Sequence, residues 1–215
     1  IDLVMLSHIA RRAGDPHGAR RHLDESADLL EPIGPKFAGP MLLSARARAL
    51  KWLLLDVDGA LTDGRLWFDA KGEVVKVFDV RDGLGIKLLT GAGVQVGILS
   101  ARTSPIVEKR SRDLGLSEVL QGRENKLDTF RDFLARHGLD ASSIAYLADD
   151  LLDLAVLGAC GLAAAPADAV PDVRSRVHYV TAAGGGRGAV RELAERILAA
   201  RGVWEEIVQR FEAAD

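Results

Sequence analysis

The sequence has few of the features that mark secreted, membrane or nucleic-acid-binding proteins. It holds a single cysteine, Cys160, so no internal disulfide is possible, and no basic stretch with a cleavage signature opens the chain; we therefore expect a reducing, cytoplasmic location. The apolar runs, such as residues 52–55 and 161–165, are much shorter than the roughly 20 residues of a membrane span. Aromatic residues make up only 5% of the chain and its formal net charge is −3, which disfavours base stacking and a basic surface for nucleic acid.

What is present is typical of a globular protein. Hydrophobic residues make up 48% and charged residues 27% of the 215 residues, enough apolar surface to exclude a disordered chain. The pattern predicts a helical extension and linker at 1–46, a main domain at 47–202 and a helical tail at 203–215. The extension resembles a single tetratricopeptide unit through Ala19, Leu23, Ala27 and Pro32. An amphipathic extension packed on the main domain is an equal alternative.

Short apolar runs alternate with amphipathic segments throughout the main domain. We predict a hairpin at 65–78, strands at 52–57, 95–99, 118–120, 144–147, 161–164 and 179–180, and helices at 83–90, 105–114, 126–137, 151–158 and 189–200. This alternation predicts an α/β fold, a Rossmann-like doubly wound parallel sheet with a β-hairpin flap. Ligand-binding loops of such folds lie at the carboxyl ends of the strands.

Reactive side chains follow the predicted strands at that edge. They are Asp56 and Asp58, Ser100, Lys126, and Asp149, Asp150 and Asp153. Several carboxylates in one crevice favour a hard divalent cation such as Mg²⁺. One carboxylate can attack phosphorus while a second, two residues along, protonates the leaving oxygen. Lysine and serine can hold the phosphoryl oxygens, so the set suits phosphoryl transfer.

These motifs carry a resemblance to a known family. LLLDVDGALTDG (53–64) resembles the first motif of the haloacid dehalogenase superfamily, and Ser100, Lys126 and Asp149 follow in the order of its later motifs. FDVRDGLGIKLL (78–89), QGRENK (121–126), ADDLLDL (148–154) and GGGRGAVRE (184–192) are similar to the 3-deoxy-D-manno-octulosonate 8-phosphate phosphatases. The resemblance covers residues 47–202 and implies a Mg²⁺-dependent hydrolase of lipopolysaccharide sugar biosynthesis, without a large cap domain.

The resemblance also implies residue roles. Asp56 is the expected nucleophile and Asp58 the acid/base. The expected metal ligands are Asp56, the Asp58 carbonyl and Asp149, with Asp150 and Asp153 tuning the metal waters and orienting Lys126. Ser100 and Lys126 are expected to hold the phosphate, with Gly59, Ala101, Arg102 and Arg187 as further substrate-binding residues. The family forms homotetramers through its hairpins, and Arg187 is a candidate for closing a neighbouring site.

Two alanines depart from the family pattern. Ala101 and Ala148 stand where glycine is usual, and alanine costs about 1 kcal/mol where φ is positive. These two departures leave one alternative open, in which the protein is a non-catalytic scaffold whose N-terminal helices dock a partner. A phosphatase for a nine-carbon sugar acid, or a cytidylyltransferase-associated phosphatase domain, is the other alternative. The resemblance implies a small phosphorylated sugar acid as substrate, while composition and charge predict no nucleic-acid or membrane partner.

Overall fold

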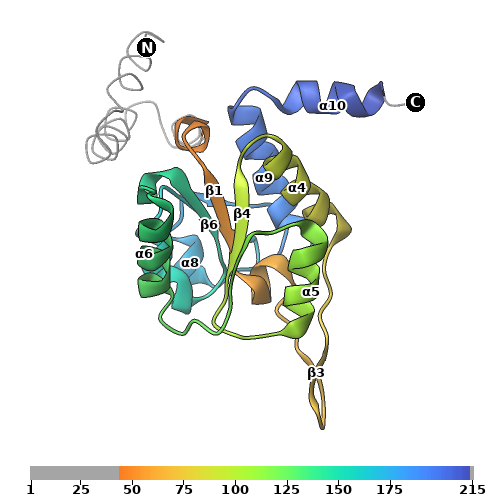
Figure 1. Ribbon diagram of the computed structural model, residues 1–215, viewed down its shortest axis with the longest axis vertical. Helices are drawn as coiled ribbons and strands as arrows, with labels where there is room; N and C mark the ends of the chain where they lie inside the picture. Colours follow the sequence, from red (N-terminus) through yellow and green to blue (C-terminus); the bar gives the residue numbers. More distant parts are fainter. Residues whose placement is uncertain (1–43, 214–215) are drawn as a thin grey trace.

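The computed structural model describes residues 44–213, so the predicted tetratricopeptide-like segment lies almost wholly outside the described part of the chain. A short helix at 44–48 leads into a parallel sheet, which occupies the middle of the molecule (Figure 1). The sheet has the strand order β5 (Glu118–Leu120), β4 (Gln95–Leu99), β1 (Trp52–Leu55), β6 (Ile144–Leu147), β7 (Leu162–Ala165) and β8 (Tyr179–Val180).

The strand order explains where a ligand can enter. From β1 the chain first adds β4 and β5 on one side, and then crosses to add β6, β7 and β8 on the other. In such doubly wound sheets the ligand crevice opens where the order reverses, at the carboxyl ends of the strands. Here β1 and β6 are direct neighbours, with Leu55 paired to Leu147. The residues that follow these two strands therefore meet at the reversal point.

Helices cover both faces of the sheet. One face carries α4 (Val80–Gly91), α5 (Pro105–Leu114) and α9 (Ala189–Ala200), and the other carries α6 (Lys126–His137), α7 (Leu154–Leu157) and α8 (Pro171–Arg174) (Figure 1). Because strand side chains alternate in direction, Leu53 and Leu55 enter the first hydrophobic core and Trp52 and Leu54 the second. Burial on both faces explains why β1 is apolar throughout.

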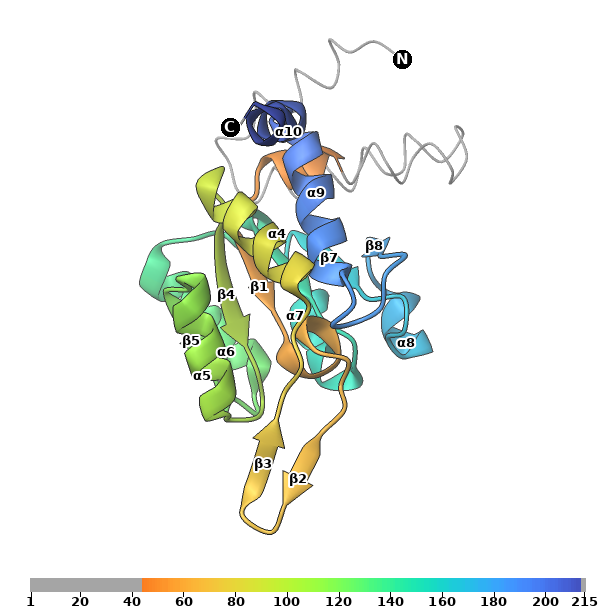
Figure 2. The same cartoon turned by 90° about the vertical axis from the view of Figure 1, so that its right-hand side faces the viewer.

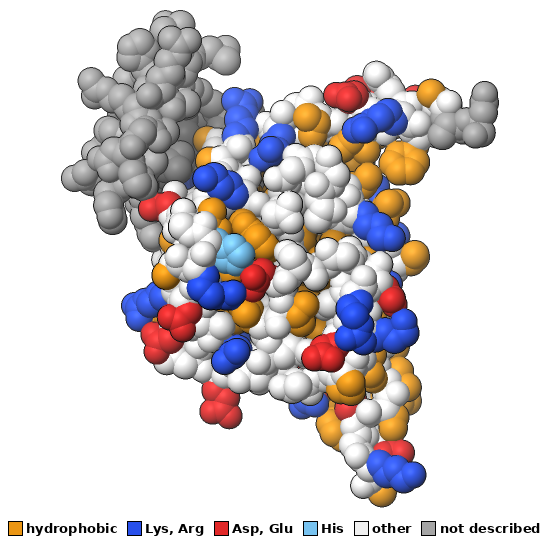
Figure 3. Space-filling view, viewed as in Figure 1, with side chains coloured by type: hydrophobic (Ala, Val, Ile, Leu, Met, Phe, Trp, Pro, Cys, Tyr) orange, Lys and Arg blue, Asp and Glu red, His pale blue; other side chains and the backbone are white. Residues whose placement is uncertain are grey.

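A hairpin extends beyond the carboxyl edge of the sheet. Its strands, β2 (Trp67–Asp69) and β3 (Gly72–Val75), pair with each other and with no strand of the main sheet (Figure 2). Apolar side chains gather along it, over the lower end of the surface in Figure 3. The exposed ones include Leu66, Trp67, Phe68, Val74, Val75 and Val77.

The predicted fold class is confirmed, and the differences are local. The predicted helix at 151–158 begins as a tighter turn, η4 (Leu151–Asp153), before α7, and the hairpin strands are shorter than predicted. Helix α8 and the short turns η2 (Val57–Leu61) and η3 (Ala141–Ser143) were not predicted. The tail forms α10 (Trp204–Glu212). In the part of the chain that the structure describes, each helix is too short or too polar to cross a bilayer.

Candidate active site

The carboxyl ends of β1 and β6 bring three carboxylates together. Asp56 follows β1, and its N–H donates to the Leu147 carbonyl at 3.0 Å, which ties the two strand ends to each other. Asp149 lies just beyond β6, and Asp153 returns to the same place on η4. One oxygen from each of the three carboxylates lies within 4.8 Å of the others.

Burial and mutual repulsion make this group costly without a cation. Burial and the nearby Asp153 raise the pKa of Asp56 to about 7, although Lys126 opposes the change. Burial, Asp56 and Asp153 likewise raise the pKa of Asp149 to about 7. Asp149 Oδ1 is buried and accepts no hydrogen bond. An orphaned oxygen among crowded carboxylates fits the oxygen-ligand set of a divalent cation such as Mg²⁺.

Gly59 leaves the space in which Asp149 lies. It has a φ of +98°, and a Cβ at this position would lie 1.9 Å from Asp149 Oδ2. Glycine is therefore required at position 59 for two reasons, the positive φ of the backbone and the close approach of the Asp149 carboxylate. The glycine-rich loop packs directly against this turn, because a Cβ at Gly185 would lie 1.8 Å from the Gly59 carbonyl oxygen.

Lys126 compensates part of the negative charge. It begins α6, and its Nζ donates to Asp56 Oδ1 at 2.7 Å and to Asp153 Oδ1 at 2.6 Å. Burial lowers the pKa of Lys126, but the two carboxylates outweigh it and the net pKa is raised. The buried Tyr146 hydroxyl lies 3.4 Å from Lys126 Nζ and also donates to Asp153. Tyr146 was missed because in the sequence it is simply one residue of an apolar strand.

Ser100 and Arg102 lie on the loop after β4, the strand that neighbours β1. Ser100 is buried, and its N–H donates to the Leu120 carbonyl at 2.8 Å. Among residues 44–213 a positive φ occurs only at glycines. Ala101 and Ala148 therefore do not have a positive φ, and they carry none of the backbone strain that alanine would have in that conformation.

Asp58 points to a different set of partners. Its carboxylate pairs with Lys76 of the hairpin and, through Oδ2 at 3.3 Å, with Arg102 Nε. Glu73 completes the group, at 3.0 Å from Lys76 Nζ. Neither Glu73 nor Lys76 was predicted, since both lie on a hairpin rather than at the end of a central strand.

Two of the predicted site residues lie outside these clusters. Asp150 is exposed, and its side chain accepts from the Leu151 N–H at the start of η4. Arg187 is exposed as well, and its carbonyl accepts from Arg81 at 2.9 Å. The loop that carries Arg187 is held in place, because the Gly186 N–H donates to the Ala60 carbonyl at 3.0 Å.

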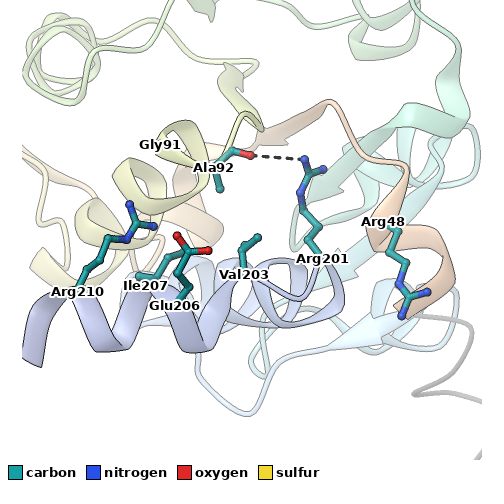
Figure 4. Close-up of a pocket in the computed structure, with 8 residues that line it drawn as sticks. All are labelled: Arg48, Gly91, Ala92, Arg201, Val203, Glu206, Ile207 and Arg210. Atoms are coloured by element: carbon teal, nitrogen blue, oxygen red, sulfur yellow. Dashed lines mark hydrogen bonds between the residues drawn. The ribbon is translucent and has the colours of Figure 1, made fainter.

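A cavity of about 480 Å³ lies at the other end of the sheet, between α10 and the end of α4 (Figure 4). Its arginines include Arg201, which donates to the carbonyls of Leu50 and Ala92 at 3.0 and 3.5 Å. None of the candidate site residues lines this cavity.

Comparison with known proteins shows close relatives, although no family model matches the chain. It is 45% identical over 153 residues to the 3-deoxy-D-manno-octulosonate 8-phosphate phosphatase KdsC of Haemophilus influenzae, which covers 71% of this chain and 85% of that protein. A cobalt-bound structure of the Haemophilus influenzae phosphatase has a TM-score of 0.75 at 42% identity, covering 78% of this chain and 99% of that one.

A phosphatase of the same name from Moraxella catarrhalis, in complex with magnesium, phosphate and the sugar acid KDO, has a TM-score of 0.76 at 33% identity. The match covers 79% of this chain and 97% of the Moraxella chain. Similarity over nearly the whole length of these relatives, together with the motif order and the fold, leads to one conclusion. The chain belongs to the 3-deoxy-D-manno-octulosonate 8-phosphate phosphatase family of the haloacid dehalogenase superfamily.

Proposed function

We propose that this protein hydrolyses 3-deoxy-D-manno-octulosonate 8-phosphate to the free sugar acid and inorganic phosphate, a step in lipopolysaccharide sugar biosynthesis. The observation that carries the proposal is the contact of Asp56 with Lys126 beside Asp149, at the reversal point of the sheet. In this proposal Asp56 would be the nucleophile, Lys126 the fixed cation, and Asp56 and Asp149 the metal ligands, all in one crevice. The names of the relatives support the choice of substrate.

The carboxylate group is the proposed Mg²⁺ site. Asp56 and Asp149 would hold the ion with the Asp58 carbonyl, while Asp150 and Asp153 would tune the metal waters and orient Lys126. The orphaned Asp149 oxygen and the raised pKa values of Asp56 and Asp149 support this assignment. Bound Mg²⁺ supplies positive charge that neutralises the carboxylates and the phosphoryl oxygens.

The proposed reaction has two balanced steps. In the first, an Asp56 oxygen forms a bond to phosphorus, the bond from phosphorus to the sugar oxygen breaks, and Asp58 gives its proton to that oxygen. In the second, Asp58 takes a proton from water as the water oxygen bonds to phosphorus and the bond to Asp56 breaks. Each step exchanges one bond at phosphorus, and Asp58 ends with the proton it began with.

The remaining residues hold the substrate. Lys126 and Ser100 would bind phosphoryl oxygens, with the backbone N–H groups of Gly59 and Ala101 as further donors. Arg102 has a side chain 42% exposed at the mouth of the site, where it can reach the sugar-acid end of the substrate. We place Arg187 with the residues that close a site, since it is exposed on the glycine-rich loop.

We further propose that the protein is a homotetramer built through its hairpins. Trp67 and Phe68 are each 57% exposed and lie on the same projecting element as exposed valines. A cluster of this kind is typical of a protein–protein interface. Several hairpins packed together would bury it.

A substrate panel tests the proposed function. With Mg²⁺ present, kcat/KM should be highest for the eight-carbon sugar-acid phosphate, and lower for nine-carbon analogues and for glucose 6-phosphate. A clear preference for a nine-carbon substrate would replace the proposed substrate while keeping the chemistry. Acid quenching during turnover, followed by peptide mapping, should find the phosphoryl group on Asp56. Phosphate on any other residue would refute the nucleophile.

A further inference from the structure

One lysine of the hairpin behaves unlike its neighbours. Val75 and Val77 are 44% and 59% exposed, whereas Lys76, between them, is only 8% exposed, and its side chain alone is 1% exposed. Lysine is rarely buried to this extent unless its charge is paired. The hairpin therefore turns one cation back toward the body of the protein while its apolar residues face outward.

The partners of Lys76 join the hairpin to the catalytic loops. Its Nζ contacts Asp58 Oδ1, on the turn after β1, and Glu73 Oε1 at 3.0 Å. Ser104, on the loop after β4, donates to the other oxygen of Glu73. Although burial raises the pKa of Glu73, the hydrogen bonds from Ser104 and Lys76 outweigh it and the net pKa is lowered. Glu73 thus stays negatively charged and fixes the lysine.

Arg102 closes the network from the other side. Its Nε lies 3.3 Å from Asp58 Oδ2, and its guanidinium lies 5.6 Å from the centre of the Phe68 ring. Each oxygen of Asp58 therefore faces a cation. The two cations differ, since the Arg102 side chain is 42% exposed at the mouth while that of Lys76 is enclosed. Lys76 is the fixed support of the Asp58 carboxylate.

We propose that Lys76, held by Glu73, is a positioning residue that orients Asp58 for proton transfer to the leaving group, so that the hairpin forms part of the active site. This inference rests on the proposed acid/base role of Asp58. Lys76 acts through Asp58, with no contact to the substrate in the proposed mechanism. The hairpin then has two roles, an apolar outer surface and an inward lysine that sets the catalytic geometry.

The leaving group distinguishes this role from simple support of the fold. An alkyl ester such as the sugar phosphate needs a proton on its leaving oxygen, whereas p-nitrophenyl phosphate releases a stable anion and needs little help. The first step is measured alone as release of the leaving group in a single turnover, because in the second step Asp58 acts as base for both esters alike. In Lys76→Met, this single-turnover rate for the sugar phosphate should fall on the order of 10- to 100-fold, because small misplacements of a catalytic group have large effects. For p-nitrophenyl phosphate, the same rate should change by less than about threefold.

Matched variants complete the experiment. Lys71→Met removes an exposed lysine of the same hairpin and should leave both rates unchanged, and Lys76→Arg should restore most of the alkyl-ester rate. A parallel fall of the single-turnover rate for both esters in a folded Lys76→Met protein, or an increase in KM alone, would overturn the proposal. If Lys76→Met does not fold, Glu73→Gln loosens the same lysine and should show the same selective loss, in smaller measure.

The test of Lys76 can be distinguished from the test of the proposed substrate. If the wild-type protein hydrolyses p-nitrophenyl phosphate but not the octulosonate 8-phosphate, the substrate assignment fails. The same comparison of alkyl and aryl esters is then made with the alkyl phosphomonoester that the panel identifies. Selective loss on that ester supports the role of Lys76, and a parallel loss refutes it.

Discussion

Binding of Mg²⁺ to the carboxylate group should release protons. Asp56 and Asp149 both have a pKa of about 7, raised from 3.8 by burial and by neighbouring carboxylates. At about pH 7 each is therefore half protonated, and an ion that needs both as carboxylates displaces about one proton in total. The number of protons released for each Mg²⁺ bound should rise toward two at about pH 5.5 and fall toward zero at about pH 8.5.

Isothermal titration calorimetry in buffers of different ionisation enthalpy measures this number directly. Asp149→Asn should release about half as many protons at about pH 7 and bind Mg²⁺ more weakly, while Asp172→Asn, an exposed change on α8, should behave as wild type. Binding without proton release over this pH range would refute the account of the site electrostatics.

The same shift predicts how stability depends on pH. The ordinary pKa of the Asp56 carboxyl is 3.8, and its pKa in the folded protein is about 7. Between these two pH values the folded state binds more protons than the unfolded state, so the free energy of unfolding should fall as pH rises. The effect for Asp56 is at most about 4 kcal/mol, from about 1.4 kcal/mol for each pH unit. Without Mg²⁺, Tm should decrease from about pH 5 to about pH 8, and saturating Mg²⁺ should remove most of the decrease. A metal-free protein whose Tm rises over this range would contradict the assignment.

Further substitutions test the geometry around the site. Gly59→Ala adds backbone strain of about 1 kcal/mol and a Cβ 1.9 Å from Asp149 Oδ2, so Mg²⁺ affinity should fall more than about tenfold in calorimetry. Gly72→Ala, with φ of +130° and nothing within 4 Å, should leave that affinity unchanged. Lys126→Met leaves two buried carboxylates uncompensated and should cost about 3–5 kcal/mol in denaturant unfolding, with kcat reduced about 100-fold or more. Trp67→Ser should reduce the mass measured by light scattering below that of a tetramer, and an unchanged mass would rule out Trp67 as an interface anchor.

The fold and the central part of the site could be predicted because both depend on local pattern. Apolar strands followed by carboxylates define β1 and β6, and a doubly wound sheet places their ends side by side. This is why the sequence alone predicts that Asp56, Asp149 and Lys126 converge. The boundaries of β4, α5, α6 and α9 follow the sequence closely, since serine–proline, asparagine and glycine mark their ends.

The rest depended on tertiary contacts that have no sequence period. Lys76 and Glu73 look like solvated hairpin residues until the hairpin folds back on Asp58. Tyr146 looks like a core residue until its hydroxyl meets Asp153. The family resemblance implies one shared role for Asp150 and Asp153. The turn of η4 separates them, exposing Asp150 and burying Asp153 against Lys126.

Phosphate release from 3-deoxy-D-manno-octulosonate 8-phosphate by the wild-type protein and by Asp56→Asn tests the central claim most directly. With Mg²⁺, the wild-type protein should release phosphate at a steady rate, and the rate should fall to background when the metal is chelated. Asp56→Asn should remain folded and release phosphate at least about 10³-fold more slowly. Equal release by the two proteins would contradict the account, because the carboxylate at the end of β1 would then not be the nucleophile.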